Sequence, residues 1–204
     1  MAQQGSDARM RLQRAAVELF REHGFDRTTA AEIAARAGVT ERTFFRHFPD
    51  KREVLFDGQA VLVNALTASI ADAPPELGPL DTLFRAFQSV TPLLEGNRSF
   101  SEPRQKVISA TPALQERELA KLDALSDALA LALKTRHVPD LQATLAARAG
   151  MAAFAHATLA WLATDELRLD ERLDAAKQAL KALLSDTRHL PKPDPSPESR
   201  KPHR

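Results

Sequence analysis

Cysteine and tyrosine are absent from this chain of 204 residues, and glycine occurs only seven times. Without cysteine the chain can form no disulfide framework, thiol nucleophile or cysteine-ligated metal site, and a cytoplasmic location is expected. No two glycines lie close enough for a phosphate-binding loop, and no serine lies in a GxSxG motif. The longest stretch without a charged side chain, residues 149–164, is too short to span a bilayer. We therefore expect no membrane contact.

The formal net charge is only +1, so any surface that binds a polyanion must be local. The six histidines include no HExxH motif and no pair one helical turn apart, which argues against a zinc site. Asp165 and Glu166 adjoin, but adjacent residues of a helix point in different directions and do not form a catalytic pair. The prediction is a protein that is not an enzyme and has no cofactor.

Prolines divide the chain, because proline removes a backbone donor and clashes with the preceding helical turn. The proline-free stretches are rich in Ala, Leu, Arg, Glu and Lys and contain no alternating β-branched runs. They predict an all-α protein of about nine helices. The expected helices cover residues 7–23, 29–37, 40–48, 50–71, 81–95, 101–109, 113–136, 140–164 and 170–187.

Three segments follow from these helices. Residues 1–49 are predicted to form an amino-terminal domain of three helices, and residues 50–188 are predicted to form a larger helical domain. Residues 189–204 are predicted to be disordered, because from Leu190 onward the chain holds five prolines and almost no apolar side chains.

Residues 28–48, TTAAEIAARAGVTERTFFRHF, have the pattern of a helix-turn-helix motif. Thr29 and Glu32 have the spacing of a capping box, and Thr40 can cap the second helix. Gly38 can take the left-handed conformation that the turn needs. The shared apolar seam is predicted to contain Leu19, Phe20, Ile33, Ala37, Val39, Phe44 and Phe48.

The second helix of this motif is predicted to turn a polar, mostly basic face away from the seam. Between residues 36 and 52, five basic residues stand against two acidic ones, a local charge of +3. Such a helix is slim enough to enter a major groove, so double-stranded DNA is the expected partner. The candidate contacts are Thr29, Thr40, Arg42, Thr43, Arg46, His47 and Lys51, with Arg9, Arg11 and Arg14 as a second basic cluster.

Residues 24–56, GFDRTTAAEIAARAGVTERTFFRHFPDKREVLF, resemble the TetR/AcrR family of bacterial repressors. The resemblance implies a homodimer that reads operator DNA and releases it when a small effector binds the carboxy-terminal bundle. It further implies that Thr29 and Lys51 hold phosphates, that Arg42 and Thr43 approach bases and that His47 touches the backbone. Family members often carry tyrosine where Phe45 stands; phenylalanine lacks the hydroxyl that bonds a phosphate, and Arg46 can replace that contact.

Residues 104–133, RQKVISATPALQERELAKLDALSDALALAL, resemble the mycofactocin-regulator subgroup, which implies an acyl-CoA-like effector. A helical bundle of this length can leave an internal cavity for a ligand. The candidate pocket residues are Phe84, Phe87, Gln88, Phe100, Arg104, Phe154, His156 and Trp161. Each aromatic residue can also serve packing alone, and His156 can be a core histidine.

The last two helices are predicted to form the dimer contact. Small residues from Ala149 to Ala160 make a smooth strip, and residues 169–183 carry apolar side chains at alternating spacings of four and three: Leu169, Leu173, Ala176, Leu180 and Leu183. Two-fold symmetry then predicts a palindromic operator. As a hypothesis, ligand binding shifts the helix of residues 50–71 and thereby changes the spacing of the two heads.

A second hypothesis is a ligand-binding carrier or protein-interaction scaffold that keeps this fold without reading DNA. The acidic side chains of Glu41 and Asp50 beside the second helix of the motif, and Phe45 in place of tyrosine, favour it. Binding to duplex DNA discriminates the two hypotheses.

Overall fold

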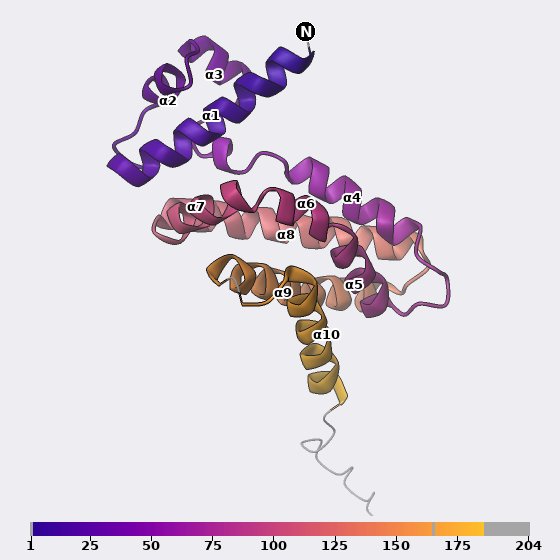
Figure 1. Cartoon of the computed structure of the whole chain (residues 1–204). Helices are drawn as coiled ribbons and strands as arrows, with labels where there is room; N and C mark the ends of the chain where they lie inside the picture. The colour runs from indigo at the N-terminus through magenta and orange to yellow at the C-terminus, as the bar shows by residue number, and fades with distance from the viewer. Residues whose placement is uncertain (1, 165, 186–204) are drawn as a thin grey trace, which may run out of the picture.

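The computed structural model describes residues 2–164 and 166–185; for residues 2–6 it defines the backbone only. Within these ranges the chain forms ten α-helices and one 3-10 turn and no strand, so the all-α prediction is confirmed (Figure 1). The predicted disordered tail lies outside the described residues. The helices are α1 (Ala2–His23), α2 (Ala30–Arg36), α3 (Glu41–His47), the 3-10 turn η1 (Glu53–Leu55), α4 (Gln59–Ala71), α5 (Pro79–Ser89), α6 (Thr91–Gly96), α7 (Arg98–Ser109), α8 (Pro112–Thr135), α9 (Asp140–Ala163) and α10 (Leu169–Ser185).

Helices α1, α2 and α3 form a small head at one end of the molecule (Figure 1). The predicted capping box is present at the start of α2, where the Thr29 side chain accepts from the Glu32 amide and the Glu32 carboxylate accepts from the Thr29 amide. The turn into α3 passes through Gly38 at φ +68°, and the Val39 amide donates to the Ala34 carbonyl at 2.9 Å. The helix-turn-helix prediction is therefore confirmed in its local geometry.

The apolar core of the head extends beyond its three helices. Its cluster of buried side chains includes Val54, Leu55 and Phe56 from the segment around η1. It also includes Val107 and Ile108 of α7 and Leu114 of α8. The head is thus packed directly on the body through a shared core, in addition to being linked to it by the chain.

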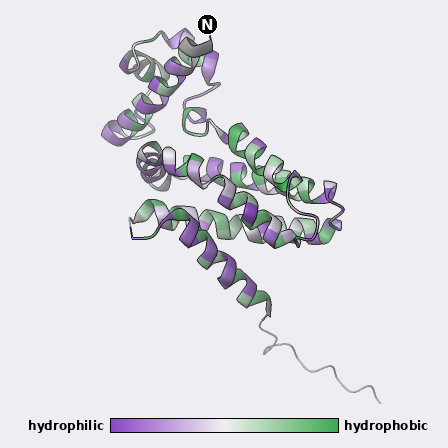
Figure 2. Cartoon of the chain, turned by 45° about the vertical axis from the view of Figure 1, so that its right-hand side comes forward, coloured by the Kyte–Doolittle hydropathy of each residue, from purple (hydrophilic) through white to green (hydrophobic). Residues whose placement is uncertain are grey.

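The body is built from α4, α5, α8, α9 and α10 around a second apolar cluster. Helices α8 and α9 pack against each other, α4 lies on α8, and α5 contacts both α4 and α9. The hydropathy colouring shows much green along α4 and α9, whereas α10 carries much purple (Figure 2). The end of α10 extends beyond the other helices (Figure 1), and Leu183 and Leu184 there are exposed. None of the described helices combines the length and apolar character that crossing a membrane requires.

Two predicted helices differ from the structure. The segment 50–71 is not one helix: Asp50 Oδ1 accepts from the amides of Arg52 and Glu53, η1 follows, and α4 begins only after Gly58. Gly58 has φ +90°, a left-handed conformation that interrupts the helix. The segment 81–95 divides into α5 and α6, and Pro92 opens the first turn of α6, where its missing amide is not needed.

Candidate nucleic-acid interface

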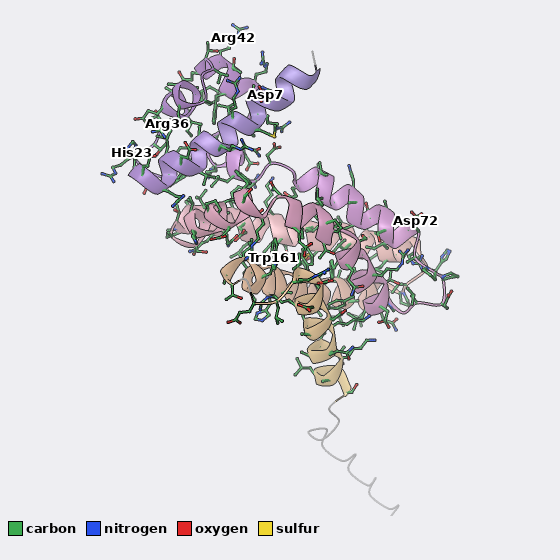
Figure 3. All side chains as sticks on the ribbon, in the orientation of Figure 1. Asp7, His23, Arg36, Arg42, Asp72 and Trp161 are labelled. Atoms are coloured by element: carbon green, nitrogen blue, oxygen red, sulfur yellow. The ribbon has the colours of Figure 1, made fainter. Side chains whose placement is uncertain are left out.

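The outward surface of α3 is polar and cationic. Phe44 and Phe48 anchor the helix from its inner side, with 0% and 2% of their surface exposed. On the opposite side Arg42, Phe45 and Arg46 are exposed. Figure 3 places Arg42 at the outer end of the head, away from the body. The structure therefore holds a rigid helix whose free side carries two cations.

The threonines of the predicted interface begin the helices of the motif. The Thr29 hydroxyl also donates to Glu32 Oε2 at 2.9 Å. Thr40 caps α3 by accepting from the Thr43 amide at 3.2 Å, and the two threonine hydroxyls lie 3.0 Å apart. Thr29 and Thr40 remain exposed and Thr43 is half-buried. Each therefore orients a helix start, and the exposed hydroxyls stay accessible from solvent.

Arg42 and Arg46 are the cations that α3 leaves free. Neither forms a hydrogen bond or an ion pair with the part of the chain that the structure describes. An unpaired guanidinium on an exposed helix is suited to phosphate oxygens or to the acceptor edge of guanine. The sequence prediction placed these two arginines on the free side of α3, and the structure does the same.

Other basic residues of the predicted interface are bound within the chain. Arg36 bridges to Glu22 at 2.9 Å, and Arg52 bridges to Asp50 at 3.0 Å. Arg9 binds both carboxylate oxygens of Asp57. Sequence reasoning missed these pairs because their members, except Arg52 and Asp50, lie far apart in the chain. The local charge of +3 therefore overstates the free cations beside α3.

Lys51 forms contacts within the chain that the sequence did not predict. Its ammonium group donates to the carbonyl oxygens of Phe25 at 2.8 Å, Thr28 at 3.0 Å and Asp26 at 3.3 Å. The same nitrogen lies 4.3 Å from the centre of the Phe25 ring. All three donors of the ammonium thus meet the loop between α1 and α2. Lys51 fixes that loop in this structure.

His47 is half-buried, and its Nε2 is buried with no hydrogen-bond partner among the described residues. Burial lowers the pKa of His47, and the charges of Arg46 and Arg9 lower it further. These effects favour the neutral form of the imidazole. The predicted contact of His47 with the DNA backbone stays a prediction.

A polar network joins the head to the body beneath this surface. Glu53 of η1 binds Arg117 at 2.5 Å and Lys121 at 3.2 Å, both on α8. Burial raises the pKa of Glu53, but hydrogen bonds from these two cations outweigh it and leave the pKa lowered. Gln59 Nε2 also donates to the Lys121 carbonyl at 3.0 Å. The segment before α4 is therefore attached to α8 as well as to the head.

The predicted pocket residues separate into three places. Phe84, Phe87, Phe154 and Trp161 are buried together in the body core, with the Phe87 and Phe154 rings stacked at 4.5 Å. Gln88 lies at the edge of that core and donates to Asp174 of α10 at 2.6 Å. Figure 3 shows Trp161 in the middle of the body.

Three of the predicted pocket residues do not join that core. Arg104 lies where α7 contacts the segment around η1. It donates to the Leu55 carbonyl at 2.5 Å and lies 5.2 Å from the centre of the Phe56 ring. Burial lowers the pKa of the Arg104 guanidinium. Phe100 packs on the core of the head. His156 is exposed on α9, so it is not the core histidine considered from sequence.

A groove that the sequence did not reveal lies between head and body. It has a volume of about 580 Å³ and is lined by the end of α1, the loop after it and the α7–α8 turn, including Phe25, Arg27, Lys106 and Pro112. Its walls come from segments some 80 residues apart, so local sequence patterns carry no signal for it.

The helix-turn-helix head carries two free arginines on its exposed helix and is packed on a helical body. This arrangement defines a DNA-binding regulator whose head and body belong to the same polypeptide. Comparison with known proteins gives the family. Residues 12–57 match the bacterial regulatory proteins of the tetR family, and residues 77–185 match the MftR C-terminal domain. The chain belongs to the TetR family of transcriptional regulators, with a C-terminal domain of the MftR type.

Individual relatives agree with this assignment. The chain is 29% identical over 186 residues to the HTH-type transcriptional regulator TcmR of Streptomyces glaucescens, covering 88% of this chain and 82% of that protein. Thermus thermophilus FadR, a TetR family transcriptional repressor solved with lauroyl-CoA, is 27% identical with a TM-score of 0.54, over 94% of this chain and 100% of FadR. SmeT of Stenotrophomonas maltophilia, solved with triclosan, shares the fold at 23% identity and a TM-score of 0.62, over 94% of this chain and 99% of SmeT.

Replacing Lys51 by methionine is expected to destabilise the protein by about 1 to 3 kcal/mol, because three loop carbonyls lose a charged donor. Urea denaturation measures this, and Arg46→Met, which removes an unpaired cation, is the control with an expected change within about 0.5 kcal/mol. The salt dependence of DNA binding should stay the same for Lys51→Met. Unchanged stability together with a salt slope reduced by about one would instead support the predicted phosphate contact.

Proposed function

We propose that this regulator acts as a homodimeric repressor that binds a palindromic operator through α3 of two heads. The observation that carries the proposal is the pair Arg42 and Arg46, which are exposed and unpaired on the second helix of the motif. Burying a free guanidinium against a phosphate or a guanine edge releases counterions and satisfies its donors. Binding and release of DNA, rather than catalysis, is then the activity of the protein.

The dimer contact is assigned to the outer side of α9 and the end of α10. Leu141, Leu145 and Leu159 of α9 are 69%, 60% and 46% exposed and recur on one side of the helix. Leu183 and Leu184 at the end of α10 are also exposed. Exposed leucines in such a row favour burial against a second copy.

Part of the seam predicted from sequence lies elsewhere. Leu169 and Leu173 are fully buried in the core of their own protomer, and Ala157 is buried with them. These residues hold α10 on the body and cannot contact a partner. The reason is that an apolar helix face can serve the protomer core or a second chain, and the spacing is the same in both cases.

The release of DNA is proposed to pass through η1 rather than through one long helix of residues 50–71. The helix of the earlier hypothesis is interrupted at Gly58, so α4 cannot transmit a rigid shift to the head. Arg117 and Lys121 of α8 hold Glu53, and Arg104 of α7 holds the Leu55 carbonyl. A ligand that moves α7 and α8 therefore moves η1 and the head with them. Only a difference in ligand affinity between the two states can drive this change.

The proposed effector is a small molecule of the acyl-CoA class, whose acyl chain is its hydrophobic part. The support is the likeness to FadR bound to lauroyl-CoA and the aromatic core around Phe87 and Phe154. Since Phe84, Phe87 and Phe154 pack tightly on one another, an acyl chain has to displace at least one of these rings. The body must then repack around the ligand, which supplies the motion that α8 passes to η1.

Replacing Arg42 by alanine is expected to weaken binding to the operator by about 1 to 3 kcal/mol while leaving binding to random duplex nearly unchanged. Gel-shift titration against duplexes selected from a random pool, and against unselected duplex, measures both. Arg85→Ala, which removes an exposed arginine of the body, is the control and should alter neither. If the native protein selects no duplex, the proposal fails and the carrier hypothesis stands.

Replacing Leu145 by arginine is expected to convert the dimer to a monomer, because a charge enters the apolar contact without a partner. Light scattering during size-exclusion chromatography gives the mass. The matched control is Leu119→Arg, since Leu119 is 67% exposed but lies on α8. A native protein that is monomeric, or a Leu145→Arg variant that stays dimeric, would contradict the assigned contact.

Lauroyl-CoA is expected to release the operator, and coenzyme A without its acyl chain is expected to have little effect, because the acyl chain is what enters the apolar core. Fluorescence anisotropy of labelled operator at rising concentration of each compound measures the release. Tighter DNA binding in the presence of lauroyl-CoA, or equal effects of the two compounds, would rule out this effector class.

A further inference from the structure

Phe45 is a large apolar side chain that the fold leaves exposed to solvent. It is 51% exposed and stands on the outward side of α3. The other aromatic residues, nine phenylalanines and one tryptophan, are all buried or half-buried. A large apolar surface kept in water needs a cause, because burying it elsewhere would stabilise the fold.

The core of the head does not explain Phe45. Among the aromatic residues that the structure describes, its ring pairs only with that of Phe44, with the centres 5.3 Å apart and the planes at 83°. Phe44 and Phe48 already fill the space between α3 and the rest of the head. The outer part of the Phe45 ring is therefore left uncovered by its own chain.

The neighbours of Phe45 indicate what covers it. On a helix, Arg42 lies one turn before Phe45, and Arg46 follows it directly. Both guanidinium groups are exposed and unpaired in the described structure. An isolated ring between two free cations is too small an apolar patch for a protein partner, whose contact would need several such side chains. The charges instead fit a polyanion that offers a single apolar group.

Duplex DNA offers such a group in the major groove. The C5-methyl of thymine is the one methyl group on the base edges there, and it stands among hydrogen-bond acceptors that suit arginine. Phe45 has no hydroxyl or amide, so it cannot bond a phosphate. Its position on the free side of α3 brings it to base edges together with Arg42.

We propose that Phe45 determines specificity by packing on the C5-methyl group of one thymine in each half of the operator. This inference rests on the proposed function, since it requires α3 to lie in the major groove. It assigns Phe45 a contact that depends on base identity, whereas Arg46 on the same surface contacts the phosphate backbone.

The test replaces each thymine of the selected operator by deoxyuridine, which lacks only the methyl group. For the native protein, one position in each half-site should lose about fourfold in affinity, the effect of exposing one buried methyl. Phe45→Ala should bind the thymine operator more weakly and show no penalty for deoxyuridine at that position. Arg42→Ala is the matched control, because it should weaken binding but keep the deoxyuridine penalty. Phe45→Leu should retain part of the penalty.

The outcomes separate this inference from the function on which it rests. If the native protein selects a duplex but no deoxyuridine position weakens binding, the inference is wrong while the proposed function stands. The same holds if Phe45→Ala keeps the full penalty. If no duplex is selected at all, both fail. Because Phe45 is exposed, its replacement should leave the thermal unfolding midpoint nearly unchanged.

Discussion

The apolar cluster that the head shares with the body is the constraint on which the rest of the structure depends. Ile33, Phe44 and Phe48 lock α2 and α3 together, and Val107 and Leu114 extend the same cluster into α7 and α8. Close-packed interiors transmit displacement because they have no space to absorb it. The orientation of α3 is therefore set by the body as much as by the turn before it.

Polar contacts add direction to this packing. Glu53, held by two cations of α8, and Arg104, held against Leu55, connect the body to the segment that follows α3. Within the head, Lys51 holds the loop after α1, and Arg9 holds Asp57. These cations have partners within the chain, whereas Arg42 and Arg46 are the arginines of α3 that have none among the described residues.

The apolar side chains of the body divide in a similar way: some are buried in the protomer core, and others are exposed and available to a second subunit. The leucines of α10 nearest its start fill the protomer core, whereas those at its end are exposed. On α9 the buried side carries Phe154 and Trp161, and the opposite side carries Leu145 and Leu159. A helix that is apolar on two sides can serve a core and a second subunit together. This is the physical basis for proposing a dimer on these two helices.

The sequence by itself determined the helical fold, the helix-turn-helix motif and the free side of α3, because caps, a glycine turn and helical periodicity act between near neighbours. Thr29 with Glu32, and Gly38, behave as their local pattern predicts. Only the tertiary structure decided which cations remain free, since the partners of Lys51 lie more than 20 residues away. It also decided that His156 faces solvent, because the side of a uniformly apolar helix that is buried depends on what packs against it.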